Sequence, residues 1–106
     1  LVFILQRGVR FPQGPPKMNY YVYILINIEK KPFFTYVGYT SNLKKRLFFH
    51  NTSKGAKFTR GRLWKLIYKK KHKTKQEALK YEYRLKKNKK KRAKIKMHYL
   101  IKNNLI

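Results

Sequence analysis

Apolar and polar positions alternate along this chain in a pattern that predicts three strands. Residues 19–27 (Asn-Tyr-Tyr-Val-Tyr-Ile-Leu-Ile-Asn) are rich in aromatic and β-branched side chains, which favour strands. Both alternating sets are apolar, so this should be a central strand that is covered on both faces. Residues 34–40 predict a second strand, and the short polar turn at 28–33 favours an antiparallel hairpin. Residues 63–68 predict a third strand, followed by a basic tail at 69–73.

Two helices are predicted from capping residues and from four-residue spacing. The first begins after Ser41 or Asn42, either of which can cap it, and two leucines four positions apart form its buried side. Arg46 and His50, also four positions apart, stack on a neighbouring face near its end. The threonine and glutamate at 74–77 form a capping box that opens the second helix.

These elements predict one α+β domain, a three-stranded antiparallel sheet flanked by helices. A chain of 106 residues with 42% hydrophobic residues can bury one modest core. Residues 1–18 carry prolines and glycines that do not support a regular element, so we expect a disordered N-terminal extension with Met18 as the natural start. Residues 19–87 should form the domain, and residues 88–106 a basic C-terminal helix or tail.

Charge is the most unusual property of the composition. Twenty-nine Lys and Arg residues stand against three Asp and Glu residues, which gives a formal net charge of +26. A chain this basic repels itself and favours a polyanionic partner, with nucleic acid ahead of an anionic membrane surface. Lysines that are simply solvated would give the same composition.

The predicted loop at 51–62 combines two glycines with cationic side chains. Backbone amides beside glycine, interleaved with Lys and Arg, suit phosphate contacts, although basic loops are also a common solvated surface. We expect nucleic-acid contacts from the loop cations and from one lysine of the preceding helix, namely Lys45, Lys54, Lys57, Arg60 and Arg62.

The shortage of acidic residues restricts the possible chemistry. Glu29 falls in the hairpin turn and Glu77 in the capping box, which leaves Glu82. A multi-carboxylate centre such as a two-metal nuclease site is therefore excluded. Glu82 could hold one divalent ion with waters and a substrate phosphate, or it could simply pair with Lys86 four residues later. The chain has no cysteine, which excludes disulfides, thiolate zinc sites and a cysteine nucleophile, and which suits a reducing cytoplasm.

Tyr23 and Tyr36 fall on adjacent predicted strands, so their hydroxyls can converge on one face of the sheet. The chain has nine tyrosines, and tyrosine is a common sheet residue, so a purely structural role stays open for both. Arg46 and His50 could likewise form an ordinary exposed pair.

The order and spacing of these residues resemble the GIY-YIG endonuclease superfamily. The likeness lies in Tyr21-Val22-Tyr23, Tyr36-Val37-Gly38, Arg46, His50 and a glutamate on a later helix. The chain is similar above all to the small stand-alone bacterial members and to the catalytic domain of the eukaryotic flap-cutting nucleases. It departs from the family pattern at Tyr21, where the family has glycine, and in two valines where the family has isoleucine.

The resemblance implies a role for each matching residue. Tyr23 would assist deprotonation of the attacking water, which calls for neighbouring cations to lower its pKa, and Tyr36 would shape that site. Arg46 would bind the scissile phosphate with bidentate bonds that lysine cannot copy. His50 would relay a proton or orient Tyr23. Glu82 would hold one Mg²⁺ or Mn²⁺ ion.

The implied function is a divalent-metal-dependent DNA endonuclease in DNA repair or processing, acting for example on branched or single-stranded DNA. This interpretation needs no membrane and no small-molecule cofactor. The alternative is a non-catalytic nucleic-acid-binding protein, for DNA or RNA, that uses the same fold. A third interpretation, a membrane-surface protein, would rely on the basic segment 86–102.

Overall fold

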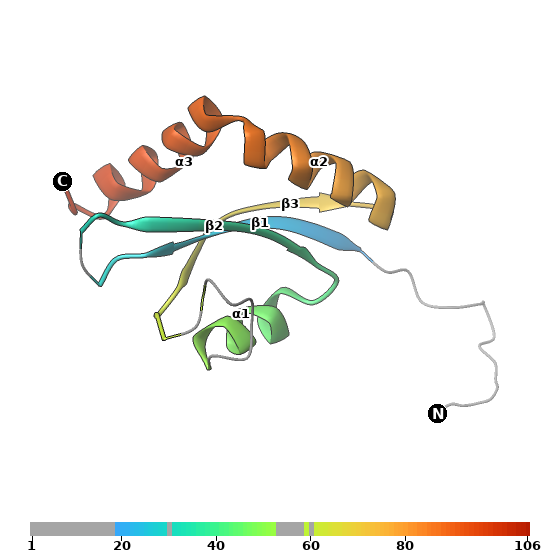
Figure 1. Cartoon of the computed structure of the whole chain (residues 1–106), viewed down its shortest axis with the longest axis horizontal. Coiled ribbons are helices and arrows are strands. Elements are labelled where there is room, and N and C mark those ends of the chain that lie inside the picture. The colour runs from blue at the N-terminus through green and yellow to red at the C-terminus, as the bar shows by residue number, and fades with distance from the viewer. Residues whose placement is uncertain (1–18, 30, 53–58, 60) are drawn as a thin grey trace.

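The computed structural model describes residues 19–29, 31–52, 59 and 61–106, and the extension predicted for residues 1–18 lies outside them. The elements in chain order are β1 (Tyr20–Asn27), β2 (Phe34–Thr40), α1 (Leu43–Asn51), β3 (Lys65–His72), α2 (Lys75–Lys87) and α3 (Lys89–Lys102). The strands form one sheet in the order β2-β1-β3. Figure 1 shows α1 on one face of this sheet and α2 with α3 along the other. The predicted α+β architecture is confirmed.

β1 is the central strand, as its two apolar faces predict. It pairs antiparallel with β2 on one side and with β3 on the other. Val22 and Ile24 contribute to a core beneath α2, whereas Tyr23 and Leu25 belong to a second core on the α1 side, which includes Trp64. The alternation of side chains along a single strand therefore builds two cores on opposite faces of the sheet.

β3 begins and ends later than predicted, at Lys65 and His72 rather than over 63–68. Tyr23 pairs with Lys69, and the ladder continues from there to the end of the strand. β3 is an edge strand, where lysine side chains extend into solvent while the backbone stays paired. The lysine run was wrongly interpreted as a tail beyond the strand because backbone pairing with β1 overrides side-chain polarity there.

Capping residues fix the starts of α1, α2 and α3. Asn42 caps α1 and Thr74 caps α2, each accepting a hydrogen bond from the backbone nitrogen three positions later. Asn88 caps α3 in the same way, so the basic C-terminal segment forms a helix. Leu100 is buried and Ile95 packs against the α2 core, which anchors α3. In the part of the chain that the structure describes, no helix is long and apolar enough to cross a membrane.

Replacing Ile24 by alanine should lower the free energy of unfolding by about 2–5 kcal/mol, because Ile24 is 1% exposed and the smaller side chain leaves a cavity. Urea denaturation measures the loss. Lys71→Ala, on the exposed side of β3, serves as the control and should stay within about 0.5 kcal/mol of the wild type. Equal losses in the two variants would contradict the assignment of Ile24 to the core.

Candidate active site

The hydroxyl of Tyr23 is the point where the predicted site residues meet. Tyr23 extends from β1 into the core on the α1 side and is 1% exposed. Its oxygen is hydrogen-bonded to Nε2 of His50 at 2.9 Å. Nε of Arg46 donates a second hydrogen bond to the same oxygen across 3.4 Å. Three residues that are separated in the sequence are thus in direct contact.

α1 positions Arg46 and His50 in front of Tyr23. The two side chains follow one another by four residues, so they lie on the same face of the helix. Leu43 and Leu47 pack on the core that contains Tyr23 and hold the helix against the sheet. Arg46 is half-buried and His50 is fully buried.

Gly38 on β2 makes room for the Tyr23 hydroxyl. The two residues are directly paired across β1 and β2. A Cβ atom on Gly38 would lie 2.5 Å from the Tyr23 hydroxyl oxygen and 2.7 Å from the ring carbon that bears it. The ring of Tyr23 on the neighbouring strand fills the space beside Gly38.

A second layer of side chains holds His50. Its Nδ1 is hydrogen-bonded to Oγ1 of the buried Thr59 at 2.8 Å. Nε1 of Trp64 donates to the Thr59 carbonyl oxygen at 3.0 Å. The side chain of Asn51 accepts from the Trp64 backbone nitrogen at 2.6 Å and donates to the Trp64 carbonyl oxygen at 3.1 Å.

Sequence reasoning missed the role of Thr59, Trp64 and Asn51. Their contacts join a loop residue, the approach to β3 and the last residue of α1, and no local periodicity links such positions. The signal in the sequence was a lone tryptophan and a threonine within an otherwise basic stretch. Such residues stand out as candidates for burial rather than for solvent contact.

Tyr36 lies beside this network. Its ring centroid is 5.1 Å from that of His50, 6.5 Å from that of Tyr23 and 6.4 Å from that of Trp64. The hydrogen bond with Tyr23 raises the pKa of Arg46, burial opposes this, and Tyr36 adds to the rise. Tyr36 therefore belongs to the same group of side chains as Tyr23, Arg46 and His50.

Burial dominates the electrostatics of the site. It raises the pKa of Tyr23 to about 12, although the hydrogen bond and the charge of Arg46 act in the opposite direction. Burial, and then the positive charge of Arg46, lower the pKa of His50 to about 4. At neutral pH Tyr23 is protonated and His50 is uncharged. The expectation that nearby cations lower the phenol pKa is wrong for the free protein, because desolvation outweighs their effect.

Glu82 lies on α2, on the face of the sheet opposite to α1 (Figure 1). Its charge contributes to the raised pKa of Tyr23, after burial and the other causes. Its side chain is 15% exposed and its carboxylate pairs with Lys86 at 3.6 Å. Among the residues described, no hydrogen bond joins Glu82 to Tyr23, Arg46 or His50, so the structure does not bring Glu82 into contact with these residues.

The residues present suit a metal ion that is held mainly by non-protein ligands. Within the described ranges, no cluster of three or more His, Cys, Asp and Glu side chains could form a metal cage. Glu82 offers one largely buried carboxylate. Mg²⁺ is commonly bound by one or two carboxylates, with waters and substrate phosphates completing its shell. This donor set fits such an ion.

The other candidate polar residues have structural contacts. Glu29 accepts hydrogen bonds from the Asn27 side chain at 2.9 Å and from the Leu63 backbone at 3.3 Å, which ties the hairpin turn to the approach to β3. Asn88 caps α3 through its side-chain oxygen.

The structure describes two of the residues that are predicted to contact nucleic acid. Lys45 is exposed on α1, with its Nζ 5.6 Å from the centre of the Phe49 ring. Arg62 lies over the Phe34 ring at 5.1 Å. The remaining three cations of this prediction lie outside the described residues, namely Lys54, Lys57 and Arg60.

A known family combines the hairpin of tyrosines, the arginine–histidine helix and the later glutamate. The family model of the GIY-YIG catalytic domain matches residues 19–96. This chain therefore belongs to the GIY-YIG family, whose members define a class of nuclease domains.

Relatives of this chain within the family are small bacterial proteins. A UPF0213 protein of Oceanobacillus iheyensis is 48% identical over 69 residues, which cover 64% of this chain and 77% of the relative. A UPF0213 protein of Streptococcus agalactiae is 45% identical over 85 residues, 77% of this chain and 93% of the relative. The solution NMR structure of a UPF0213 protein from Bacillus halodurans is 38% identical and covers 76% of this chain and 85% of its own, with a TM-score of 0.43. These names state no activity.

Replacing Gly38 by alanine should destabilise the protein by about 1–3 kcal/mol and displace the Tyr23 hydroxyl, because the added methyl group overlaps it. Thermal or urea denaturation measures the loss. The same replacement in a Tyr23→Leu background should cost less, since the shorter side chain lacks both the oxygen and the ring carbon that the methyl group meets. If Gly38→Ala lowers the free energy of unfolding as much in that background as in the wild type, the assigned clash is refuted.

Replacing His50 by glutamine should reduce the dependence of stability on pH. An unfolded histidine has a pKa near 6.5 and folded His50 about 4, so the unfolded chain binds an extra proton between these values. The contribution of His50 is complete above pH 6.5 and is lost as pH falls to 4, by at most about 1.4 kcal/mol per pH unit.

Urea denaturation of the wild type and of His50→Gln from pH 7 to pH 4 measures this difference. His72, whose pKa burial also lowers, is present in both proteins and cancels in the comparison. Parallel pH profiles for the two proteins would show that His50 is not held neutral by the fold.

Proposed function

We propose that this protein is a divalent-metal-dependent DNA endonuclease that hydrolyses phosphodiester bonds. Membership of the GIY-YIG family supports a nuclease. The observation that carries the proposal is the Tyr23 hydroxyl, which contacts an arginine and an uncharged histidine inside a hydrophobic core. Burying such a network costs free energy, whereas apolar side chains would fill the same space without that cost. A chemical role accounts for its presence.

Arg46 binds the scissile phosphate in this proposal. Its hydrogen bond to Tyr23 is long, at 3.4 Å, and a phosphate offers shorter, charge-assisted and bidentate bonds. Movement of the guanidinium onto the phosphate uncovers the Tyr23 hydroxyl, which the free protein buries. The positive charge then stabilises the negative charge that develops in the transition state.

Tyr23 and His50 move the proton of the attacking water. With a pKa of about 12, Tyr23 keeps its proton at neutral pH. It therefore acts as a relay, in which its oxygen takes the water proton while its own proton passes to Nε2 of His50. The relay requires the His50 tautomer that carries its proton on Nδ1 and donates it to Thr59 Oγ1 at 2.8 Å, so that Nε2 can accept a proton. The water oxygen bonds to phosphorus, the bond to the leaving oxygen breaks, and that oxygen takes a proton from solvent.

Glu82 is the residue that we assign to the divalent ion, Mg²⁺ or Mn²⁺. Such an ion, when bound, polarises the phosphoryl oxygens. The single carboxylate leaves most of its ligands to waters and to the substrate. Tyr36 forms a wall of the site beside His50 and so shapes it.

DNA in branched or single-stranded form, during repair or processing, is the proposed substrate. The net charge of +26 favours a polyanion and predicts binding that weakens steeply with salt. Substrate choice then rests on backbone shape and charge. We assign backbone contacts to the cations of α1 and of the following loop, namely Lys45, Lys54, Lys57, Arg60 and Arg62.

A second candidate function is binding of nucleic acid without catalysis. The observation that favours it is the positive charge, which far exceeds what one catalytic site requires. A binder of this kind should hold DNA equally well in the presence of a metal chelator and should never nick it.

Arg46→Lys and Glu82→Gln should each reduce metal-dependent cleavage of plasmid and branched DNA by about two orders of magnitude or more. Arg46→Lys keeps the charge but loses the bidentate geometry. Glu82→Gln removes the one carboxylate assigned to the ion. Cleavage is measured with Mg²⁺ and Mn²⁺ under saturating protein, beside duplex binding in chelator.

Glu77→Gln is the matched control, because Glu77 is exposed at the start of the same helix. It should cleave like the wild type. Undiminished cleavage by both Arg46→Lys and Glu82→Gln would remove the assigned site. Tight, salt-sensitive binding with no cleavage by the wild type on any substrate would establish the binding function instead.

A further inference from the structure

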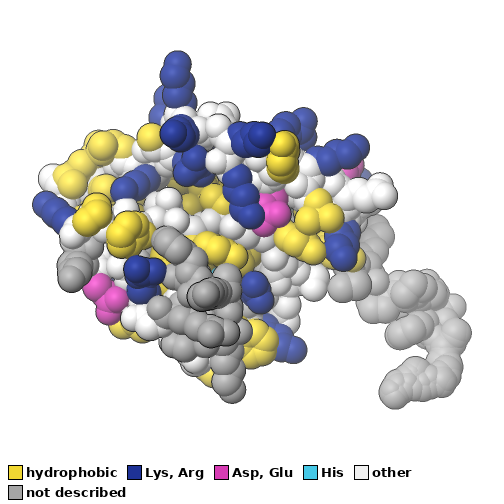
Figure 2. All heavy atoms as spheres, viewed as in Figure 1, with side chains coloured by type: hydrophobic (Ala, Val, Ile, Leu, Met, Phe, Trp, Pro, Cys, Tyr) yellow, Lys and Arg dark blue, Asp and Glu magenta, His cyan; other side chains and the backbone are white. Residues whose placement is uncertain are grey.

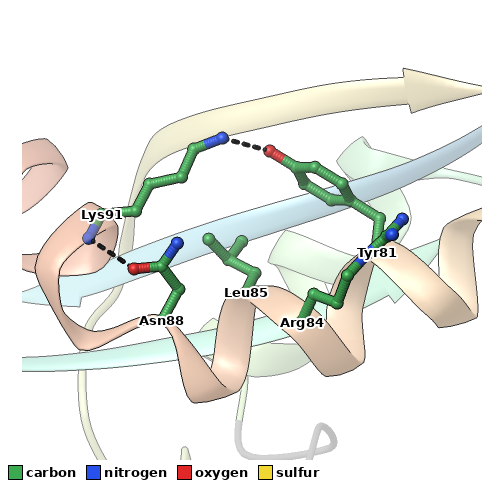
Figure 3. A pocket seen from close by; sticks show the side chains of 5 residues that line it. All are labelled: Tyr81, Arg84, Leu85, Asn88 and Lys91. Carbon is green, nitrogen blue, oxygen red and sulfur yellow. Dashed lines mark hydrogen bonds between the residues drawn. The ribbon is translucent and has the colours of Figure 1, made fainter.

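A pair of tyrosine hydroxyls lies at the centre of a second polar cluster, between β3 and the two C-terminal helices. The hydroxyls of Tyr68 and Tyr81 are 2.5 Å apart. Nζ of Lys91 donates to the Tyr81 hydroxyl at 2.9 Å. Figure 3 shows Lys91 reaching across a cavity of about 220 Å³ toward Tyr81, with Arg84 beside it.

Cations gather around Tyr81 from three elements. Lys91 Nζ lies 5.2 Å and Lys70 Nζ 5.8 Å from the centre of its ring. A second hollow of about 580 Å³ adjoins the first and shares Tyr81 and Arg84 with it. Its other charged lining residues include Lys73, Lys80 and a single carboxylate, Glu77.

These cations have no acidic partner close by. Among the described residues, Lys86 and Glu82 form an ion pair at 3.6 Å. Within the same part of the chain, Lys70, Arg84 and Lys91 have no carboxylate within 4 Å. Figure 2 shows Lys and Arg side chains spread over the region of α2 and α3, with few acidic side chains between them. Like charges held this closely repel one another, and an anion bound among them would relieve the repulsion.

Two further observations point to a ligand in the cleft that these two adjoining hollows form around Tyr81 and Arg84. His72 lines the larger hollow, and its Nε2 is the one buried side-chain nitrogen or oxygen, in the part of the chain described, that lacks a hydrogen-bond partner. One nitrogen of a neutral imidazole can donate a hydrogen bond, and Nε2 of His72 has no partner among the described residues of the protein. Burial raises the pKa of Tyr81, yet the hydrogen bonds from Lys91 and Tyr68 and the nearby lysine charges lower it overall. The local field therefore favours negative charge.

This cleft is separate from the Tyr23 site. Lys70 pairs with Val22, and Val22 belongs to the core beneath α2. Lys69, the next residue along β3, pairs with Tyr23 on the α1 face. The cleft and the cluster of Tyr23, Arg46 and His50 therefore lie on opposite faces of the sheet, whereas Glu82, which we assign to the metal ion, follows Tyr81 directly on α2.

We propose that the cleft lined by Lys70, Tyr81, Arg84 and Lys91 binds a backbone phosphate of a second DNA segment, so that one molecule holds nucleic acid on both faces of its sheet. The guanidinium and the two ammonium groups contact the phosphate oxygens, and Tyr81 and His72 add neutral donors. The choice of DNA as the source of the phosphate rests on the proposed function, whereas the anion site itself does not.

Binding of a short labelled DNA duplex in chelator tests the proposal, for the wild type and for the triple variant Lys70→Gln/Arg84→Gln/Lys91→Gln. The matched control, Lys31→Gln/Lys44→Gln/Lys65→Gln, removes the same charge from exposed positions elsewhere. The cleft variant should bind at least tenfold more weakly than the control. Its slope of log affinity against log salt should fall by about 0.9 for each phosphate that the variant no longer neutralises.

Tyr81→Phe, which keeps the ring and removes the hydroxyl, should weaken binding several-fold without a change in the circular dichroism spectrum. Equal affinities of the two triple variants would overturn the proposal. NMR shifts of Tyr81 and Lys91 with inorganic phosphate, combined with such equal affinities, would assign the cleft to a free anion and also overturn it. The binding assay uses chelator, so its result does not depend on whether the protein cleaves DNA. Cleavage by the cleft variant at saturating protein would support two separate sites.

Discussion

The candidate active site depends on the close approach of the Tyr23 hydroxyl to Gly38. No side chain larger than hydrogen fits on β2 at this position, because a Cβ atom there would lie 2.5 Å from the hydroxyl oxygen. The space lets the hydroxyl lie between β2 and α1, where Arg46 and His50 reach it. His50, held in turn by Thr59, meets the hydroxyl at this position.

Much of the fold could be predicted from the sequence because its signals are local. β1 and β2 follow from aromatic and β-branched runs, and α1 and α2 from the caps at Asn42 and Thr74. The end of β3 could not be predicted in this way, because lysine side chains conceal a strand whose pairing is decided by β1.

The candidate site shows the same division between local and non-local information. Arg46 and His50 are recognisable from helical spacing, and Tyr23 from its strand. Thr59 and Trp64 contribute through contacts between separate segments, which a single sequence does not reveal. The direction of the pKa shift of Tyr23 was also out of reach, since it depends on the balance between burial and the charge of Arg46.

The central sheet divides the molecule into two surfaces with different chemistry. On the α1 side, a buried phenol, an uncharged imidazole and a half-buried guanidinium form a compact polar network. On the other side, the cations of β3, α2 and α3 surround Tyr81 with little acidic compensation. With a net charge of +26, both surfaces are positively charged, so charge alone does not distinguish a catalytic face from a binding face. The geometry around Tyr23 and around Tyr81 distinguishes them.

Single-turnover cleavage by Tyr23→Phe, with saturating protein and Mg²⁺ or Mn²⁺, tests the central claim most directly. The replacement removes one oxygen from a buried ring and leaves the charge of the protein unchanged. If Tyr23 relays the proton of the attacking water, the rate should fall by about 10²–10⁴-fold, while duplex affinity in chelator stays close to that of the wild type. A cleavage rate equal to that of the wild type would contradict the account and leave the Tyr23 hydroxyl with a structural role.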